Sequence, residues 1–114
     1  MRRIAFLAAI CGFGAATILA GSAQEVKLFG GVFRVNHSGS DPLPYLGAQV
    51  FLYPKDGGDR IGPSVTDASG HFSFYDIPDG TYLLQVQIEV DYEERVAWRQ
   101  SVRVPSTVRP IVLP

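Results

Sequence analysis

Cysteine, histidine and strong net charge are scarce in this 114-residue sequence, and each shortage excludes a class of function. The single cysteine, Cys11, lies in an apolar N-terminal stretch, so the rest of the chain has no thiolate nucleophile, zinc-thiolate site or disulfide. After residue 23, eight basic residues stand against eleven acidic ones, a net charge of −3. Domains that bind nucleic acid are usually basic. The composition therefore predicts neither cysteine chemistry nor a nucleic-acid partner.

The N-terminal stretch has the three parts of a secretory signal. It begins with two arginines, continues with a run of about sixteen mostly apolar residues, and ends in small residues that include Gly21 and Ala23. A membrane-spanning helix needs about twenty apolar residues, more than this run provides. We therefore expect residues 1–23 to be a signal peptide that is cleaved between Ala23 and Gln24. The mature chain would be a single domain of residues 24–114, periplasmic or secreted, with no stable membrane span.

Alternation of apolar and polar residues dominates the rest of the chain. In residues 82–90 the even positions are apolar, and in residues 96–104 Val96, Trp98, Val102 and Val104 share one side. A period of two is typical of a β-strand with one buried face. Both segments are therefore predicted to be strands that bury their even-numbered side chains.

The pairing of these two strands follows from that alternation. Paired residues point to the same side of a sheet, so even positions must face even positions and the connecting loop must have an odd length. A five-residue loop would pair Val90 with Val96. A three-residue loop would pair Val90 with Glu94. The sequence leaves both registers open.

Five further strands are predicted between turn signals rich in Gly, Pro and Asp. Gly30 and Gly31 indicate a bulge or a close approach within the first of them, and Pro63 indicates an edge position for the third. Seven short strands in about ninety residues predict an all-β fold, a seven-stranded antiparallel β-sandwich of the immunoglobulin/prealbumin-like kind. The five further strands are expected at residues 26–35, 48–53, 60–66, 71–75 and 107–113.

Residues 66–86 read TDASGHFSFYDIPDGTYLLQV. This string resembles the carboxypeptidase regulatory-like domains, relatives of the Cna B-type and transthyretin-like sandwiches. Their pattern is T-D-x-x-G-x-F-x-F, followed after a few residues by P-x-G-x-Y-x-L-x-V. The similarity covers about residues 28–90, with a longer segment between Val35 and Leu43 than the family has. It implies a β-sandwich and an accessory, non-catalytic module, because the pattern contains turn and core residues only.

The residues able to carry chemistry are few. His37 lies in a Ser/Gly-rich loop and His71 follows a turn, so we expect no shared metal site. Asp56, Asp59 and Asp67 would suit calcium only if a compact loop gathered six to eight oxygens. Turn formation explains each aspartate more simply, although calcium remains the alternative. The sequence therefore predicts no catalytic residue, no metal and no cofactor.

An enzyme is the alternative function. Transthyretin-like hydroxyisourate hydrolases have a similar length and sandwich form, but they end in Tyr-Arg-Gly-Ser. This chain ends in Arg-Pro-Ile-Val-Leu-Pro. A small hydrolase is therefore disfavoured, and we do not expect an enzyme.

Binding of a protein or of a cell-envelope glycan is the function that the sequence favours. If Val50 and Leu52 point inward, their neighbours project outward and offer aromatic rings on which a sugar can stack. The alternative is that these aromatic rings lie under a loop or between the sheets. The candidate binding face consists of Gln49, Phe51 and Tyr53, and a polar strip of Gln85, Gln87 and Arg99 is expected on another outer face.

Overall fold

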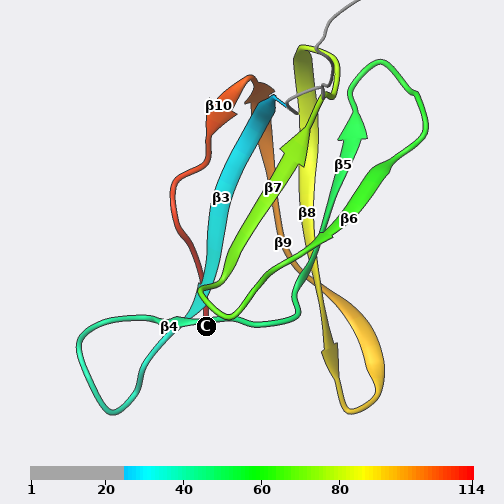
Figure 1. The fold of residues 1–114 in the computed structure, drawn as a ribbon. Helices are drawn as coiled ribbons and strands as arrows, with labels where there is room; N and C mark the ends of the chain where they lie inside the picture. The colour runs from blue at the N-terminus through cyan, green and yellow to red at the C-terminus, as the bar shows by residue number, and fades with distance from the viewer. Residues whose placement is uncertain (1–24) are drawn as a thin grey trace, which may run out of the picture.

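Apolar side chains at every second position give each strand one face to bury, and the chain folds into two facing β-sheets (Figure 1). The computed structural model describes residues 25–114, so the predicted signal peptide and its cleavage site at Ala23 and Gln24 lie outside the described residues. Residues 25–114 are all-β and contain no helix. In particular, they include no helix with the length and apolar character needed to cross a membrane.

One sheet has four antiparallel strands in the order β6-β5-β8-β9. The predicted strand at residues 60–66 is confirmed as an edge strand of this sheet, which suits Pro63 because proline lacks an N–H for a second neighbour. The strands are β5 (Gln49–Pro54), β6 (Ile61–Val65), β8 (Gly80–Val90) and β9 (Glu93–Val104).

The other sheet has five strands built around β3 (Val26–Arg34). Its remaining members are β4 (Leu43–Pro44), β7 (His71–Tyr75), β10 (Ser106–Thr107) and β11 (Ile111–Leu113). β4 and β7 pair with β3 in the antiparallel sense, whereas β10 and β11 run parallel to it. The segment predicted as one strand at residues 107–113 forms the two short strands β10 and β11. Because both run parallel to β3, the prediction of a wholly antiparallel, seven-stranded fold is wrong. Pro110, which has no backbone N–H to donate, lies in the interruption.

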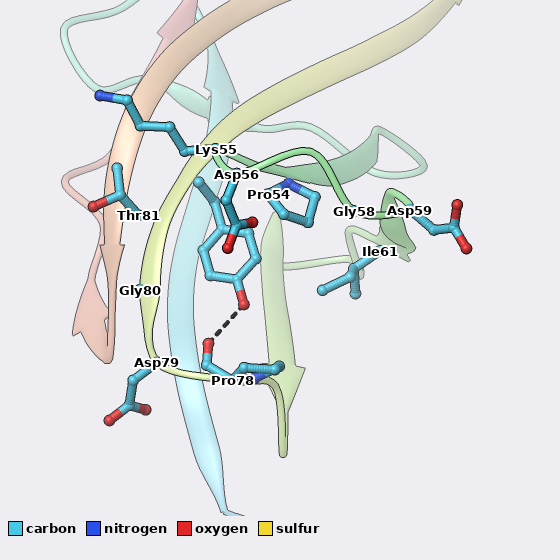
Figure 2. Close-up of a pocket in the computed structure, with 11 residues that line it drawn as sticks. Pro54, Lys55, Asp56, Gly58, Asp59, Ile61, Pro78, Asp79, Gly80 and Thr81 are labelled. Atoms are coloured by element: carbon cyan, nitrogen blue, oxygen red, sulfur yellow. Dashed lines mark hydrogen bonds between the residues drawn. The ribbon is translucent and has the colours of Figure 1, made fainter.

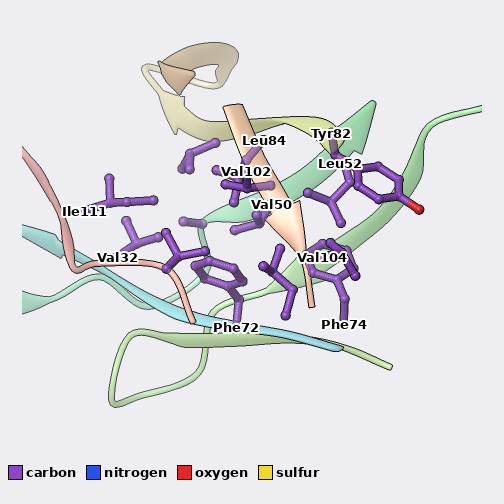
Figure 3. Close-up of a cluster of buried hydrophobic side chains, with 14 of the residues drawn as sticks. Val32, Val50, Leu52, Phe72, Phe74, Tyr82, Leu84, Val102, Val104 and Ile111 are labelled. Carbon is purple, nitrogen blue, oxygen red and sulfur yellow. The ribbon is translucent and has the colours of Figure 1, made fainter. Parts of the chain in front are cut away.

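Inward side chains from both sheets form one continuous core (Figure 3). The predicted inward positions of β7 are confirmed, because Phe72 and Phe74 are buried and their rings meet edge to face with centroids 6.2 Å apart. The predicted close approach at Gly30 is also confirmed, since a Cβ there would lie 2.6 Å from the Phe72 ring. Opposite them, the four-stranded sheet contributes Val50, Leu52, Tyr82, Leu84, Val86, Val102 and Val104.

The turn before β7 depends on Gly70. Its φ of +80° lies in the left-handed region, and a Cβ would fall 2.5 Å from the Val32 carbonyl oxygen. The Gly70 carbonyl also accepts a hydrogen bond from the Val32 N–H at 2.8 Å. The glycine thus lets the turn lie directly against β3.

Gly70→Ala is expected to lower the free energy of unfolding by about 2 to 3 kcal/mol, because it adds a backbone contact to the strain of positive φ. Gly57→Ala is the matched control, since Gly57 has a φ of +92° but no atom within 4 Å of the added Cβ. It should cost only about 1 kcal/mol. Urea unfolding of both variants measures the difference, and equal losses would contradict the contact.

The hairpin between β8 and β9 corrects the predicted register. Asp91 and Tyr92 form a two-residue turn with φ values of 53° and 66°, and Val90 pairs with Glu93. The loop is therefore even in length, and both odd-length alternatives are wrong. Two residues of positive φ are what a tight hairpin turn requires.

A bulge farther along β9 brings its even-numbered residues from Trp98 onward opposite the even-numbered residues of β8. Val86 pairs with Trp98, but the next pair is Gln87 with Val96, so Ala97 is left over on β9. Val96 consequently points to the outer side of the sheet beside Gln87, and the prediction that it is buried is wrong. Trp98 keeps the side of Val86 but remains 36% exposed at the sheet edge, so its predicted burial is wrong as well. The inward positions of Val102 and Val104 are confirmed.

Candidate functional site

The candidate binding residues lie on the outer side of the four-stranded sheet. Phe51 of β5 pairs with Gln85 of β8, and Gln85 pairs with Arg99 of β9. The strip predicted for a separate outer face is therefore part of the same face. We call this surface the polar face; it comprises Gln49, Phe51, Tyr53, Gln85, Gln87 and Arg99, together with Arg60 from the loop before β6.

Hydrogen bonds connect the polar face across three strands. The Arg99 Nε donates to Gln85 Oε1 at 2.9 Å, and the Gln85 Nε2 donates to the Tyr53 hydroxyl at 3.4 Å. The Arg60 Nη1 donates to the same hydroxyl at 3.5 Å. Its guanidinium carbon also lies 4.2 Å from the centroid of the Phe51 ring, in cation–π geometry. The side chains of this face are therefore largely occupied with one another.

The prediction that Phe51 projects into solvent is wrong, and the alternative that its ring is covered by a loop holds for this residue. Its side chain is only 3% exposed, because Arg60 covers the ring. Tyr53 is half-buried, with its hydroxyl engaged by Gln85 and Arg60. The polar face thus presents no open aromatic ring for stacking on a sugar, although Gln49 and Gln87 remain partly accessible.

A hollow of about 630 Å³ lies beside the turn between β7 and β8 (Figure 2). Asp56, Asp59 and Asp79 line it, and Asp79 is ion-paired with the Lys27 Nζ at 2.5 Å. The Tyr82 hydroxyl donates to the Pro78 carbonyl at 2.6 Å and closes the turn. Burial, followed by the negative charges of Asp56 and Asp79, raises the pKa of the Tyr82 phenol. The phenol therefore remains a hydrogen-bond donor.

The three aspartates considered for calcium are not gathered at one site, because Asp56 and Asp59 line the hollow and Asp67 does not. Asp67 lies in the turn before β7, whereas the hollow adjoins the turn after that strand. Its Oδ1 accepts backbone N–H bonds from Ser69 at 2.9 Å and His71 at 3.0 Å. These bonds, led by the one from His71, lower the pKa of the Asp67 carboxyl and explain the residue as a turn former.

The two histidines also occupy different parts of the fold. His37 lies in the loop between β3 and β4, and His71 is the first residue of β7. Within residues 25–114, no three or more His, Cys, Asp or Glu side chains are grouped in a way that could hold a metal ion.

Sequence reasoning missed an aromatic surface on the outer side of the five-stranded sheet. We call it the aromatic face and define it by Phe29 and Phe33 of β3 and His71 and Tyr75 of β7. Phe29 is 37% exposed and Tyr75 is 44% exposed. The Phe29 and His71 rings have centroids 5.1 Å apart and are tilted by 50°. Rings from two adjacent strands therefore share one accessible surface.

Gly31 forms the floor of the aromatic face. It pairs with His71 across the strands, and a Cβ on it would lie 2.8 Å from the Phe33 ring and 3.4 Å from the His71 ring. The missing side chain leaves room for the Phe33 ring over Gly31. The sequence signal is Phe-x-Gly-x-Phe, in which two aromatic residues flank a glycine at strand period.

Comparison with known proteins adds no assignment to this geometry. The chain matches no model of a known protein family, and none of the curated proteins compared with it is significantly similar in sequence.

Proposed function

We propose that this chain is an exported, non-catalytic β-sandwich module of the carboxypeptidase regulatory-like type, and that it binds a cell-envelope glycan through the aromatic face. The observation that carries the proposal is the accessible group of rings around Gly31. The C–H groups of a pyranose ring pack against such rings, while neighbouring polar side chains satisfy the sugar hydroxyls. His71 and Ser73 supply polar groups on the same outer side of β7.

The family resemblance is supported by what the motif residues do. Thr66 is buried in a hydrogen-bond network, Asp67 closes its turn, and Gly70 has the positive φ that the turn needs. Phe72 and Phe74 fill the core. Each of these residues has a structural task, which agrees with a fold motif that carries no catalysis.

Sheet stabilisation alone does not account for the aromatic face. An aromatic ring lying over a glycine in a strand protects the backbone, and this explains Phe33, whose ring lies over Gly31 of the same strand. Phe29 and Tyr75 are not needed for that purpose and keep more than a third of their surface in solvent. Exposed aromatic groups of this kind mark interaction sites.

The double variant Phe29→Ala with Tyr75→Ala is expected to bind purified peptidoglycan sacculi about tenfold more weakly than the parent protein. Each stacked ring contributes about 0.5 to 1.5 kcal/mol beyond its buried area, and 1.4 kcal/mol corresponds to a factor of ten. Co-sedimentation at increasing sacculus concentration measures the affinity. Thermal unfolding checks that the variant is folded.

Tyr92→Ala is the matched control, because Tyr92 is a highly exposed aromatic residue at the tip of the β8–β9 hairpin and outside the aromatic face. It should sediment like the parent protein. Equal losses in both variants would indicate nonspecific adhesion, and unchanged binding by the double variant would remove the aromatic face from the proposal. A parent protein that never sediments with sacculi would contradict this glycan as the ligand.

A further inference from the structure

Among the strands of residues 25–114, none lies beside the outer edge of β9. β9 is the last strand in the order β6-β5-β8-β9, and its twelve residues make it the longest strand of the described chain. Every second residue of an edge strand directs its N–H and C=O away from the sheet. The opposite edge, β6, has five residues and contains Pro63, which has no N–H to offer a partner. β9 is therefore the edge better able to pair with an added strand.

The usable part of this edge is residues 98–104. The bulge at Ala97 interrupts regular pairing at one end. At the other end the Ser106 hydroxyl donates to the Arg103 carbonyl, and the chain leaves the sheet at Pro105. A partner strand of about the same length would be matched to this segment.

The outer side of residues 98–104 carries positive charge that the described chain does not neutralise. Arg99 and Arg103 lie on this side, next to Gln85 and Thr81 of β8. The two ion pairs found in residues 25–114 are Lys27 with Asp79 and Arg95 with Glu93, so neither arginine has a carboxylate within 4.0 Å. Opposite charges placed across two strands stabilise their pairing.

The other side of the same segment exposes the ring of Trp98. Trp98 is 36% exposed, and its Nε1 already donates to the Gln100 Oε1 at 2.8 Å. The polar atom of the indole is therefore satisfied within β9, and the remaining exposed ring surface suits an apolar neighbour. Gln100 and the buried Val102 follow on the same side of the strand.

A second copy of the chain is a poor occupant of this edge. In the antiparallel register that overlaps all of residues 98–104, Arg99 of each copy would lie opposite Arg103 of the other. Like charges directly opposite each other destabilise a strand pair. The arginines therefore select against self-association and in favour of an acidic partner.

We propose that residues 98–104 of β9 accept an extended segment of an acidic protein by strand addition. Its carboxylates, at alternate positions, face Arg99 and Arg103, and its apolar residues between them cover the exposed ring surface of Trp98. Backbone hydrogen bonds to the free edge supply affinity, and the arginines supply selectivity. This protein-binding edge is independent of the proposed glycan-binding face.

The experiment uses the purified protein and the fluorescence of Trp98, the single tryptophan of the sequence. A synthetic peptide of about ten residues with alternating valine and glutamate is the probe. It should change the tryptophan emission saturably. The corresponding valine–lysine peptide should bind at least about tenfold more weakly. A valine–glutamate peptide N-methylated at its central residues, which cannot form the backbone bonds, should show a similar loss.

The charge-reversed variant Arg99→Glu with Arg103→Glu should invert the preference and favour the lysine peptide. Absence of saturable binding by the glutamate peptide, or equal affinity for both peptides, would overturn the proposal and leave the arginines as protection against edge-to-edge aggregation. Equal binding of the N-methylated peptide would exclude strand addition. The charge-reversed variant should still bind sacculi, and the Phe29→Ala, Tyr75→Ala variant should still bind the glutamate peptide. These two controls distinguish failure of one proposal from failure of the other.

Discussion

Phe74→Ala is expected to lower the free energy of unfolding by about 3 to 5 kcal/mol, a large share of the stability of a small domain. The ring is buried between the two sheets and contacts Phe72 edge to face. Alanine removes the transfer free energy of the ring and leaves a cavity that the surrounding strands fill only in part. Urea titration followed by tryptophan fluorescence or circular dichroism measures the loss.

Tyr75→Ala is the matched control, because Tyr75 is the next residue of β7 and its side chain points to the opposite, outer side of the sheet. It should cost less than about 1 kcal/mol. A similar loss in both variants would mean that the two faces of β7 do not differ in burial. A loss below about 1 kcal/mol for Phe74→Ala would show that its ring is not in the core.

Thr66→Val should cost about 2 to 4 kcal/mol, although valine has nearly the same shape as threonine. The Thr66 hydroxyl accepts the Ala48 N–H at 2.9 Å and donates to the Tyr45 carbonyl at 2.5 Å. Valine removes both bonds and leaves the buried Ala48 N–H and the part-buried Tyr45 carbonyl without this partner, and an unpaired buried group costs about 1 to 3 kcal/mol. The network therefore fixes the chain before β5 against the end of β6.

Thr66→Ser separates the hydroxyl from the methyl group. Serine keeps both hydrogen bonds and removes one methyl, so it should cost about 1 kcal/mol. Guanidinium unfolding of the two variants under identical conditions gives the comparison. If the serine variant were less stable than the valine variant, packing of the methyl group, and not the hydrogen bonds, would explain the role of Thr66.

Alternation predicted the strands whose two faces differ clearly in polarity. In β7 and the first part of β8 the aromatic and aliphatic residues at even positions are buried, as expected for one face packed on a core. Toward the hairpin tip Ile88 is half-buried and Val90 is exposed, so the prediction of burial is wrong for Val90. Alternation does not reveal an extra residue in a strand. The parity argument for the β8–β9 loop failed because the unpaired Ala97 lets an even loop and buried even positions coexist.

The candidate site was harder to predict than the strands. The direction of Phe51 followed from its neighbours, but the burial of its ring depends on Arg60, which arrives from a loop nine residues later in the sequence. The pattern predicts a strand that contains Phe29 and Phe33, but their exposure depends on which strands flank β3 and on the space above Gly31. Such long-range coverage is not encoded in a local pattern.

The position of β3 between early and late parts of the chain has a consequence for when this protein acquires its structure. β10 and β11 flank the strand that comes first among the described elements, so the five-stranded sheet closes only after residues 106–113 have been synthesised. Pairings so distant in sequence slow folding and leave this sheet incomplete until β10 and β11 have been made. If the chain is exported as proposed, this late closure would favour passage through a secretory translocation pore before the five-stranded sheet forms.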